Sequence, residues 1–327
     1  LLAYIANMKV SFFSRRAAKN AGWLVAGRVL HMALAFLVNL LTARYLGPSN
    51  YGLVNYAALY TAFFTSFATL GLSSLLLKDF MDDPEGAGTT VGTAIAMRLL
   101  SSTLSAVSIL AIVAAVDRGE RLTMTVVALY SMSLIFQAFD TIQYWFQSRL
   151  ESKYATIATS VGYIIVSFYK VLLLVLGKDV RWFAISNTID YAVAAIVFLG
   201  LYKWRGGPRL HISPAKGRAL LRQSGSFILC GLMVSVYNCT DRFMLKHLLD
   251  EASVGYYATA TSLATVWTFV LSAIIDSITP GIMQAHRTDR AQFVRHNRQL
   301  YALVFYLSVA VSAVITLLAR PAVSLLY

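Results

Sequence analysis

The stretch LLTARYLGPSNYGLVNYA (Leu40–Ala57) interrupts a long apolar run with Arg44 and with Gly-Pro-Ser-Asn at residues 47–50, then becomes apolar again at once. Gly, Pro, Ser and Asn are typical of tight turns, and a helix rarely continues through them unbroken. Gly52 permits a close approach or an unusual backbone angle where the next helix begins. The stretch therefore predicts a helical hairpin.

The composition places these helices in a membrane. Apolar residues make up 58% of the 327 residues and charged residues only 13%, whereas soluble domains carry about 25% charged residues. Apolar runs of this length exclude barrel strands, which alternate over roughly 10 residues. We expect an all-α integral membrane protein with about nine spans, at roughly 21–44, 53–77, 91–116, 122–147, 155–176, 182–202, 223–246, 254–280 and 299–319.

The net charge of +13 is explained by orientation and does not require nucleic acid as a partner. Lys and Arg lie in short loops between predicted spans, and one side of the membrane holds more than twice as many as the other. Because cytoplasmic loops carry the excess of basic residues, this side is expected to be cytoplasmic. We therefore expect a multi-pass protein of the cell (inner, cytoplasmic) membrane, with a cytoplasmic N-terminus and an outer Gly47 turn.

A weaker copy of the hairpin, LKHLLDEASVGYYATA (Leu245–Ala260), follows about two hundred residues later. A shift of 203 residues aligns Gly52 with Gly255, and predicted spans one and two with spans seven and eight. An even number of spans separates the copies, so they share one orientation, as in a parallel repeat about a pseudo-twofold axis. We expect a cytoplasmic segment (1–20), an N-lobe of six spans (21–202), a basic inter-lobe loop (203–222) and the start of a truncated C-lobe (223–327).

The two hairpins resemble a known family. TARYLGPSNYGLVNYA (residues 42–57), after a span carrying GRVLH (27–31), resembles the first hairpin of the polysaccharide flippases, which transport lipid-linked oligosaccharides such as O-antigen precursors. NCTDRFMLKHLLDEASVGYYATATSLA (Asn238–Ala264) resembles their seventh-span signature. These proteins belong to the multidrug/oligosaccharidyl-lipid/polysaccharide exporter superfamily. The resemblance implies a V-shaped exporter fold of two six-helix lobes, and a polyprenyl-pyrophosphate-linked oligosaccharide flipped outward by alternating access.

Other functions are less consistent with the residues. A cation-coupled multidrug exporter of the same superfamily is the first alternative, although acidic and aromatic cavity walls would be typical of it. A membrane glycan polymerase or ligase would carry a large outer loop, and no such loop is predicted. We expect no enzyme activity, catalytic residue, metal or cofactor, since no zinc spacing, P-loop or dinucleotide motif occurs. Expected partners are the lipid-linked substrate, glycan polymerase or other assembly proteins, and anionic lipids near residues 285–300.

Charged side chains at membrane depth supply the candidate site. Each costs roughly 2.5–3.5 kcal/mol on insertion scales, so such residues are retained for pairing, a wet cavity or a ligand. Helical spacing places Arg28, His31 and Asn39 on one stripe of span one, and the equivalent stripe of span seven carries Asn238 and Arg242. We expect the stripes to face each other across a central cavity. The candidate substrate-binding residues are Arg28, Asn39, Arg98, Lys170, Asn238 and Arg242.

Cations at two depths would let a pyrophosphate head exchange partners, because Arg binds phosphate through a planar fork of donors. A buried carboxylate could carry a coupling proton. The candidates for proton or ion coupling are Asp190, Asp140, Asp241, Asp276 and His31, with Asp190 first. Structural pairing, snorkelling or interfacial placement remain alternatives for the charged residues, and a core position remains one for His31.

Overall fold

The computed structural model describes residues 15–265, 267–268, 271, 275 and 290–326, and it leaves the side chains of residues 15–30 undescribed. All the described elements are helices, so the expected all-α class is confirmed. They are α2 (Arg15–Ala68), α3 (Ser73–Asp82), α4 (Ala87–Val116), α5 (Arg121–Ser131), α6 (Ser133–Gln137), the 3₁₀ helix η1 (Ala138–Asp140), α7 (Thr141–Ser148), α8 (Ser152–Val175), α9 (Val180–Trp204), α10 (Pro214–Leu248), α11 (Glu251–Thr265) and α13 (Arg290–Leu326).

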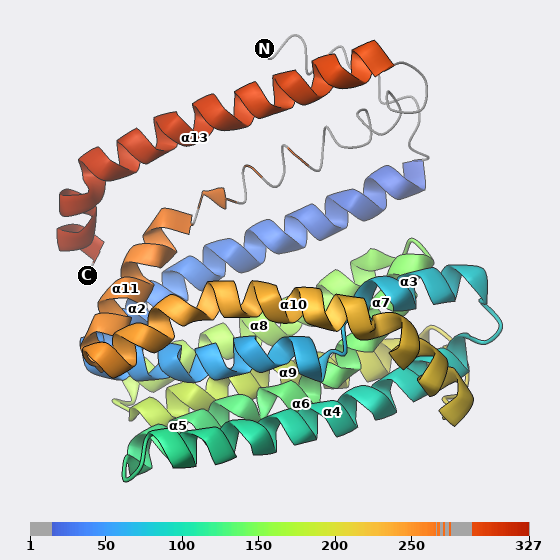
Figure 1. Ribbon diagram of the computed structural model, residues 1–327, viewed down its shortest axis with the longest axis horizontal. Helices are drawn as coiled ribbons and strands as arrows, with labels where there is room; N and C mark the ends of the chain where they lie inside the picture. The colour runs from blue at the N-terminus through green and yellow to red at the C-terminus, as the bar shows by residue number, and fades with distance from the viewer. Residues whose placement is uncertain (1–14, 266, 269–270, 272–274, 276–289, 327) are drawn as a thin grey trace.

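Helix α2 is the predicted hairpin. Its helix is broken at Gly47, which has φ 72° and ψ 172°, a backbone conformation that favours glycine. Pro48 follows directly and starts the second arm, where its missing N–H costs nothing. The two arms meet near α11 at the left of Figure 1.

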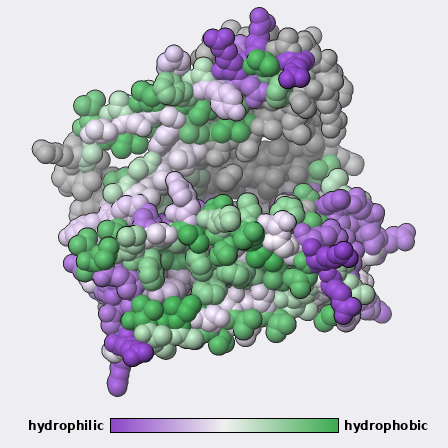
Figure 2. Space-filling model, viewed as in Figure 1, coloured by the Kyte–Doolittle hydropathy of each residue, from purple (hydrophilic) through white to green (hydrophobic). Residues whose placement is uncertain are grey.

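The helices run between two polar ends. We call the end with the turns at Gly47, 117–120, 176–179 and 249–250 the Gly47 end, and the opposite end the Lys203 end. Figure 2 shows hydrophilic residues gathered at both ends of the viewed face, with mostly hydrophobic ones between them. Six of the described helices are long and apolar enough to cross a bilayer: 87–116, 121–148, 152–175, 180–204, 214–248 and 292–317.

The second predicted span ends earlier than expected. We expected a helix to residue 77, but α2 ends at Ala68 and the short α3 follows a turn. Leu70 and Gly71 both have positive φ, and a Cβ atom on Gly71 would lie 2.8 Å from Cβ of Phe227 on α10. The chain therefore turns where α10 packs closely against it.

The link between the two halves is shorter than expected. Residues 203–222 were expected to form a loop, but α9 continues to Trp204 and α10 begins at Pro214. The Ser213 side chain accepts a hydrogen bond from the Lys216 backbone N–H (3.3 Å), and Pro214 occupies the first helical position. This Ser-Pro pair is a helix start signal that the basic composition obscured. We refer to α2–α9 as the first half and to α10 onward as the second half.

Two clusters of buried side chains form the core of the first half. One, around Leu53, Tyr56 and Phe183, lies toward the Gly47 end, and α10 and α11 contribute Cys239 and Ala258 to it. The other surrounds Trp145 and Phe198 toward the Lys203 end. The first half is thus a packed unit on which the second half rests.

Candidate functional site

A buried cation, Arg98, occupies the middle of the first half. Its side chain on α4 is 3% exposed, and Nη1 donates a hydrogen bond to Oγ1 of Thr141 (3.0 Å). The Asp140 carboxylate lies within electrostatic range of it. A guanidinium can persist in such a dry place only because these partners compensate for its lost hydration.

The helical span opposite Arg98 is broken, which explains how Asp140 and Thr141 reach it. Residues 121–148 cross as α5, α6, η1 and α7, so a 3₁₀ turn lies at Ala138–Asp140. Such turns within a span often mark functional positions. Among the described residues, three buried polar atoms on α4 and α6 have no hydrogen-bond partner: Arg98 Nε, Ser133 Oγ and Gln137 Oε1. Buried polar atoms without a partner are rare in proteins, so these three atoms mark a position where water or an ion could supply the missing hydrogen bonds.

A second charge pair lies on the neighbouring helices. Lys170 on α8 and Asp190 on α9 interact electrostatically, and Asp190 also lies within range of Asp140. Gly162 allows the close approach of α8 and α9, because a Cβ atom there would lie 3.0 Å from Oδ1 of Asp190. The four predicted residues Arg98, Asp140, Lys170 and Asp190 therefore form one group, which we call the paired-charge cluster.

His31 joins this group from the first arm of α2. Its ring centroid lies 3.9 Å from that of Tyr163 on α8, and Lys170 lies within electrostatic range. Asn39, further along α2, is half-buried. Arg28 lies on the same arm, but its side chain is outside the described part of the chain, and Asp276 lies outside the described residues altogether.

The predicted residues of α10 form a separate group nearer the Gly47 end. Asp241 accepts hydrogen bonds from the Tyr257 hydroxyl on α11 and from the Arg242 backbone N–H, the latter at 2.8 Å. Arg242 is half-buried, and its Nε is buried without a hydrogen-bond partner among the described residues. Asn238 is exposed. The structure thus does not bring these three residues into the paired-charge cluster.

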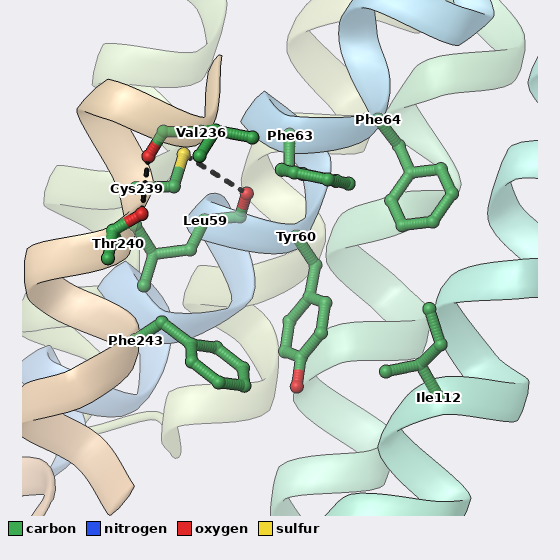
Figure 3. A pocket seen from close by; sticks show the side chains of 9 residues that line it. All are labelled: Leu59, Tyr60, Phe63, Phe64, Ile112, Val236, Cys239, Thr240 and Phe243. Carbon is green, nitrogen blue, oxygen red and sulfur yellow. Dashed lines mark hydrogen bonds between the residues drawn. The ribbon is translucent and has the colours of Figure 1, made fainter. Parts of the chain in front are cut away.

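An apolar cavity of about 280 Å³ lies between the second arm of α2, α4 and α10 (Figure 3). Its polar groups are already bonded: Thr240 Oγ1 to the Val236 carbonyl oxygen (2.6 Å), Cys239 Sγ to the Leu59 carbonyl oxygen (3.8 Å) and the Tyr60 hydroxyl to that of Tyr56 (2.8 Å). The cavity therefore suits hydrocarbon. Its lining comprises Leu59, Tyr60, Phe63, Phe64, Ile112, Val236, Cys239, Thr240 and Phe243.

Sequence reasoning missed a group of charges at the Gly47 end. Lys246 on α10 lies 3.0 Å from Glu120 in the connection between α4 and α5, and 3.1 Å from Glu251 on α11. The stretches that carry them, DRGER (117–121) and KHLLDE (246–251), each hold both acidic and basic residues near the end of a predicted span. Charges of both signs at one end of the molecule were the available signal, but no spacing rule relates residues as far apart as Glu120 and Lys246.

These arrangements are suited to binding and moving charges. The paired-charge cluster offers cations for an anionic group and carboxylates that can exchange protons. Among the described residues no cluster of three or more His, Cys, Asp or Glu side chains could hold a metal ion.

The chain is similar to known proteins in sequence and in fold. The family model for polysaccharide biosynthesis proteins matches residues 17–286. No curated protein sequence matches significantly. Solved structures of similar fold include an inward-facing multidrug resistance MATE transporter of the MOP superfamily, with a TM-score of 0.70 and 17% identity over 90% of this chain and 72% of that one. An outward-facing MATE transporter of the same superfamily has a TM-score of 0.68 and 16% identity over 95% of this chain and 74% of that one.

A third similar structure is a MOP superfamily transporter from Pyrococcus furiosus, whose binding pocket is described as having reverse polarity and suggesting a different function (TM-score 0.69, 15% identity, 95% and 74% coverage). The expected V-shaped exporter fold is therefore confirmed.

Proposed function

Because the chain belongs to the polysaccharide biosynthesis protein family, we propose that it flips a polyprenyl-pyrophosphate-linked oligosaccharide from the cytoplasmic to the outer leaflet by alternating access. The chain is a multi-pass membrane transporter of the MOP superfamily. The nature of the cargo and the direction of movement are the content of the proposal.

The observation that carries the proposal is the paired-charge cluster. Its two cations, Arg98 and Lys170, balance its two carboxylates, Asp140 and Asp190. A site for cationic drugs would hold more carboxylates than cations. An anionic pyrophosphate needs cations instead, and it can bind the cations of the cluster in place of the carboxylates. Release of the cations would leave the carboxylates free to take up protons, which would couple transport to a proton gradient.

The apolar cavity supports a lipid-linked cargo. It is lined by α2 and α4 of the first half and by α10 of the second half. All its polar lining groups are bonded internally, so a hydrocarbon chain could enter without leaving a polar atom unpaired. We assign the polyprenyl chain to it, and the pyrophosphate to cations deeper in the molecule.

The proposed orientation puts the Lys203 end in the cytoplasm and the Gly47 end outside, in the inner membrane of the cell. The excess of Lys and Arg at the Lys203 end supports it. The first turns of α13, with Arg290, Arg295 and Arg298, also lie on the proposed cytoplasmic side, where they would meet anionic lipid headgroups.

A cation-coupled multidrug exporter is the second candidate. It is favoured by the fold shared with multidrug resistance transporters and by the two carboxylates of the cluster. In that case the carboxylates would bind the cargo directly, and the cations would serve only to pair them.

One reconstitution experiment separates the two candidates. The full chain is placed in liposomes with a fluorescent polyprenyl-pyrophosphate oligosaccharide, and the label is followed with a membrane-impermeant quencher. We expect flipping to exceed that of empty vesicles, with little transport of a fluorescent organic cation in parallel vesicles. Transport of the organic cation without flipping would reject the proposal in favour of the exporter.

A further inference from the structure

The two helical hairpins cross at the Gly47 end through a reciprocal pair of glycines. A Cβ atom on Gly52 would overlap the carbonyl oxygen of Glu251, and one on Gly255 would overlap the carbonyl oxygen of Pro48. The shift of 203 residues that aligns Gly52 with Gly255 also aligns Pro48 with Glu251, so each hairpin makes the same contact with the other. The crossing therefore follows the internal repeat and brings the two halves into backbone contact.

An ion-pair network fastens this crossing. Lys246 Nζ lies 3.0 Å from Oε2 of Glu120, in the first half, and 3.1 Å from Oε1 of Glu251, in the second half. The Lys246 side chain is only 9% exposed, and its ammonium lies 5.5 Å from the centre of the Tyr56 ring. Ser49 on α2 donates a further hydrogen bond to Glu251 (3.3 Å). One largely buried cation thus joins carboxylates from both halves.

A second polar contact lies beside the first. The Tyr56 hydroxyl donates to Oδ2 of Asp117 (2.9 Å), and Nε2 of His247 lies 3.9 Å from Oδ1 of the same carboxylate. Burial raises the pKa of Asp117 above its ordinary value. The pKa of Glu120 is lowered, first by the hydrogen bond from Thr123 and then by Lys246. The Glu120 carboxylate is therefore ionised at neutral pH, as the ion pair with Lys246 requires.

At the Lys203 end the contact between the halves involves the start of α10, next to the link. Lys216 lies 2.7 Å from Asp79 on α3, and the Ser213 backbone N–H donates to Thr93 on α4 (2.9 Å). These contacts keep the start of α10 near the first half whatever its far end does. Separation of the halves at the Gly47 end must therefore break the pair between Lys246 and Glu120.

We propose that Glu120, Lys246 and Glu251 form an ionic lock that holds the Gly47 end of the transporter closed, and that this end opens when Lys246 releases Glu120. The inference rests on the proposed function in one respect: closure of one end is useful to a transporter that opens alternately to the two sides of the membrane. The glycine crossing gives the lock its contact surface, and the ion pairs set how long the contact lasts.

The lock is tested by the distance between the halves, which does not depend on cargo. Spin labels are attached at Lys178→Cys, in the first half, and Leu249→Cys, in the second, after Cys230→Ser and Cys239→Ser. Double electron–electron resonance spectroscopy then measures the distribution of distances between the two spin labels in the full chain in lipid nanodiscs. Glu120→Gln and Lys246→Gln should each raise the population at long distance about threefold or more. The matched control Glu85→Gln, an exposed acid between α3 and α4, should leave the distribution unchanged.

The outcomes separate the lock from the proposed function. Unchanged spin-label distances in Glu120→Gln would overturn the lock. Because Glu120 lies on an exposed connection, this variant should fold, and it tests the lock even if Lys246→Gln does not fold. Shifted distances in a protein that does not flip the lipid-linked oligosaccharide keep the lock and reject the proposed function. Flipping with unshifted distances keeps the function and rejects the lock.

Discussion

At the scale of single residues, two glycines set how closely the hairpins approach. Gly52→Ala would force a Cβ atom into the carbonyl oxygen of Glu251, and such overpacking costs about 1–3 kcal/mol. We expect a lower thermal unfolding midpoint for the purified protein. Gly200→Ala on α9, where a Cβ atom meets nothing within 4 Å, should keep or slightly raise the midpoint. Equal midpoints for the two variants would contradict the tight crossing.

The pair of Arg98 and Asp140 gives a second prediction at this scale. Arg98→Met removes the buried cation within electrostatic range of the half-buried Asp140 carboxylate, and leaving a charged group uncompensated in this way costs about 1–3 kcal/mol. Removing the carboxylate too, in Arg98→Met with Asp140→Asn, should restore much of the stability. Thermal unfolding of both variants checks this, with exposed Arg222→Met as the control. A double variant no more stable than the single one would show that the residues are not coupled.

At the scale of helices, the apolar cavity depends on the spacing of the second arm of α2, α4 and α10. Ile112→Trp on α4 fills the cavity with an indole ring. If the polyprenyl chain enters there, flipping in liposomes should slow by about tenfold, equivalent to about 1.4 kcal/mol. The protein should still purify as a folded species.

Leu104→Trp is the matched control for the cavity. Leu104 is on the same helix, is 67% exposed and does not line the cavity, so its variant should flip at the original rate. A normal rate for Ile112→Trp would remove the cavity from the transport path.

The helix boundaries show how much of the fold can be predicted from local sequence. The break at Gly47 was predictable, because Gly-Pro has a strong local preference that the tertiary structure does not oppose. The end of α2 at Ala68 was not, since Leu70 adopts a left-handed conformation that few leucines take and that depends on α10 packing alongside. The start of α10 carries a capping signal, Ser213-Pro214, within a basic stretch whose composition is otherwise typical of a loop.

At the scale of the whole molecule, the repeat predicted from sequence explains the hairpin crossing, because equivalent residues meet across it. The composition of the candidate site was also predictable, since charges are rare at membrane depth. Which of these charged residues lie next to one another was not predictable. Lys170 and Asp190 lie on different helices, and Glu120 lies in the connection between α4 and α5, far in sequence from Lys246 on α10. The proximity within each pair therefore depends on packing that no periodicity encodes.

The paired-charge cluster is tested most directly by the flipping rate of Lys170→Gln, measured with the labelled lipid-linked oligosaccharide and the impermeant quencher. Loss of a charged hydrogen-bond donor to the pyrophosphate should slow flipping by about 10- to 100-fold, equivalent to about 1.5–3 kcal/mol. Lys203, an exposed lysine, provides the control. The variant Lys203→Gln should flip the substrate at the original rate. Equal rates for Lys170→Gln, Lys203→Gln and the unmodified protein would contradict a role for the cluster in transport.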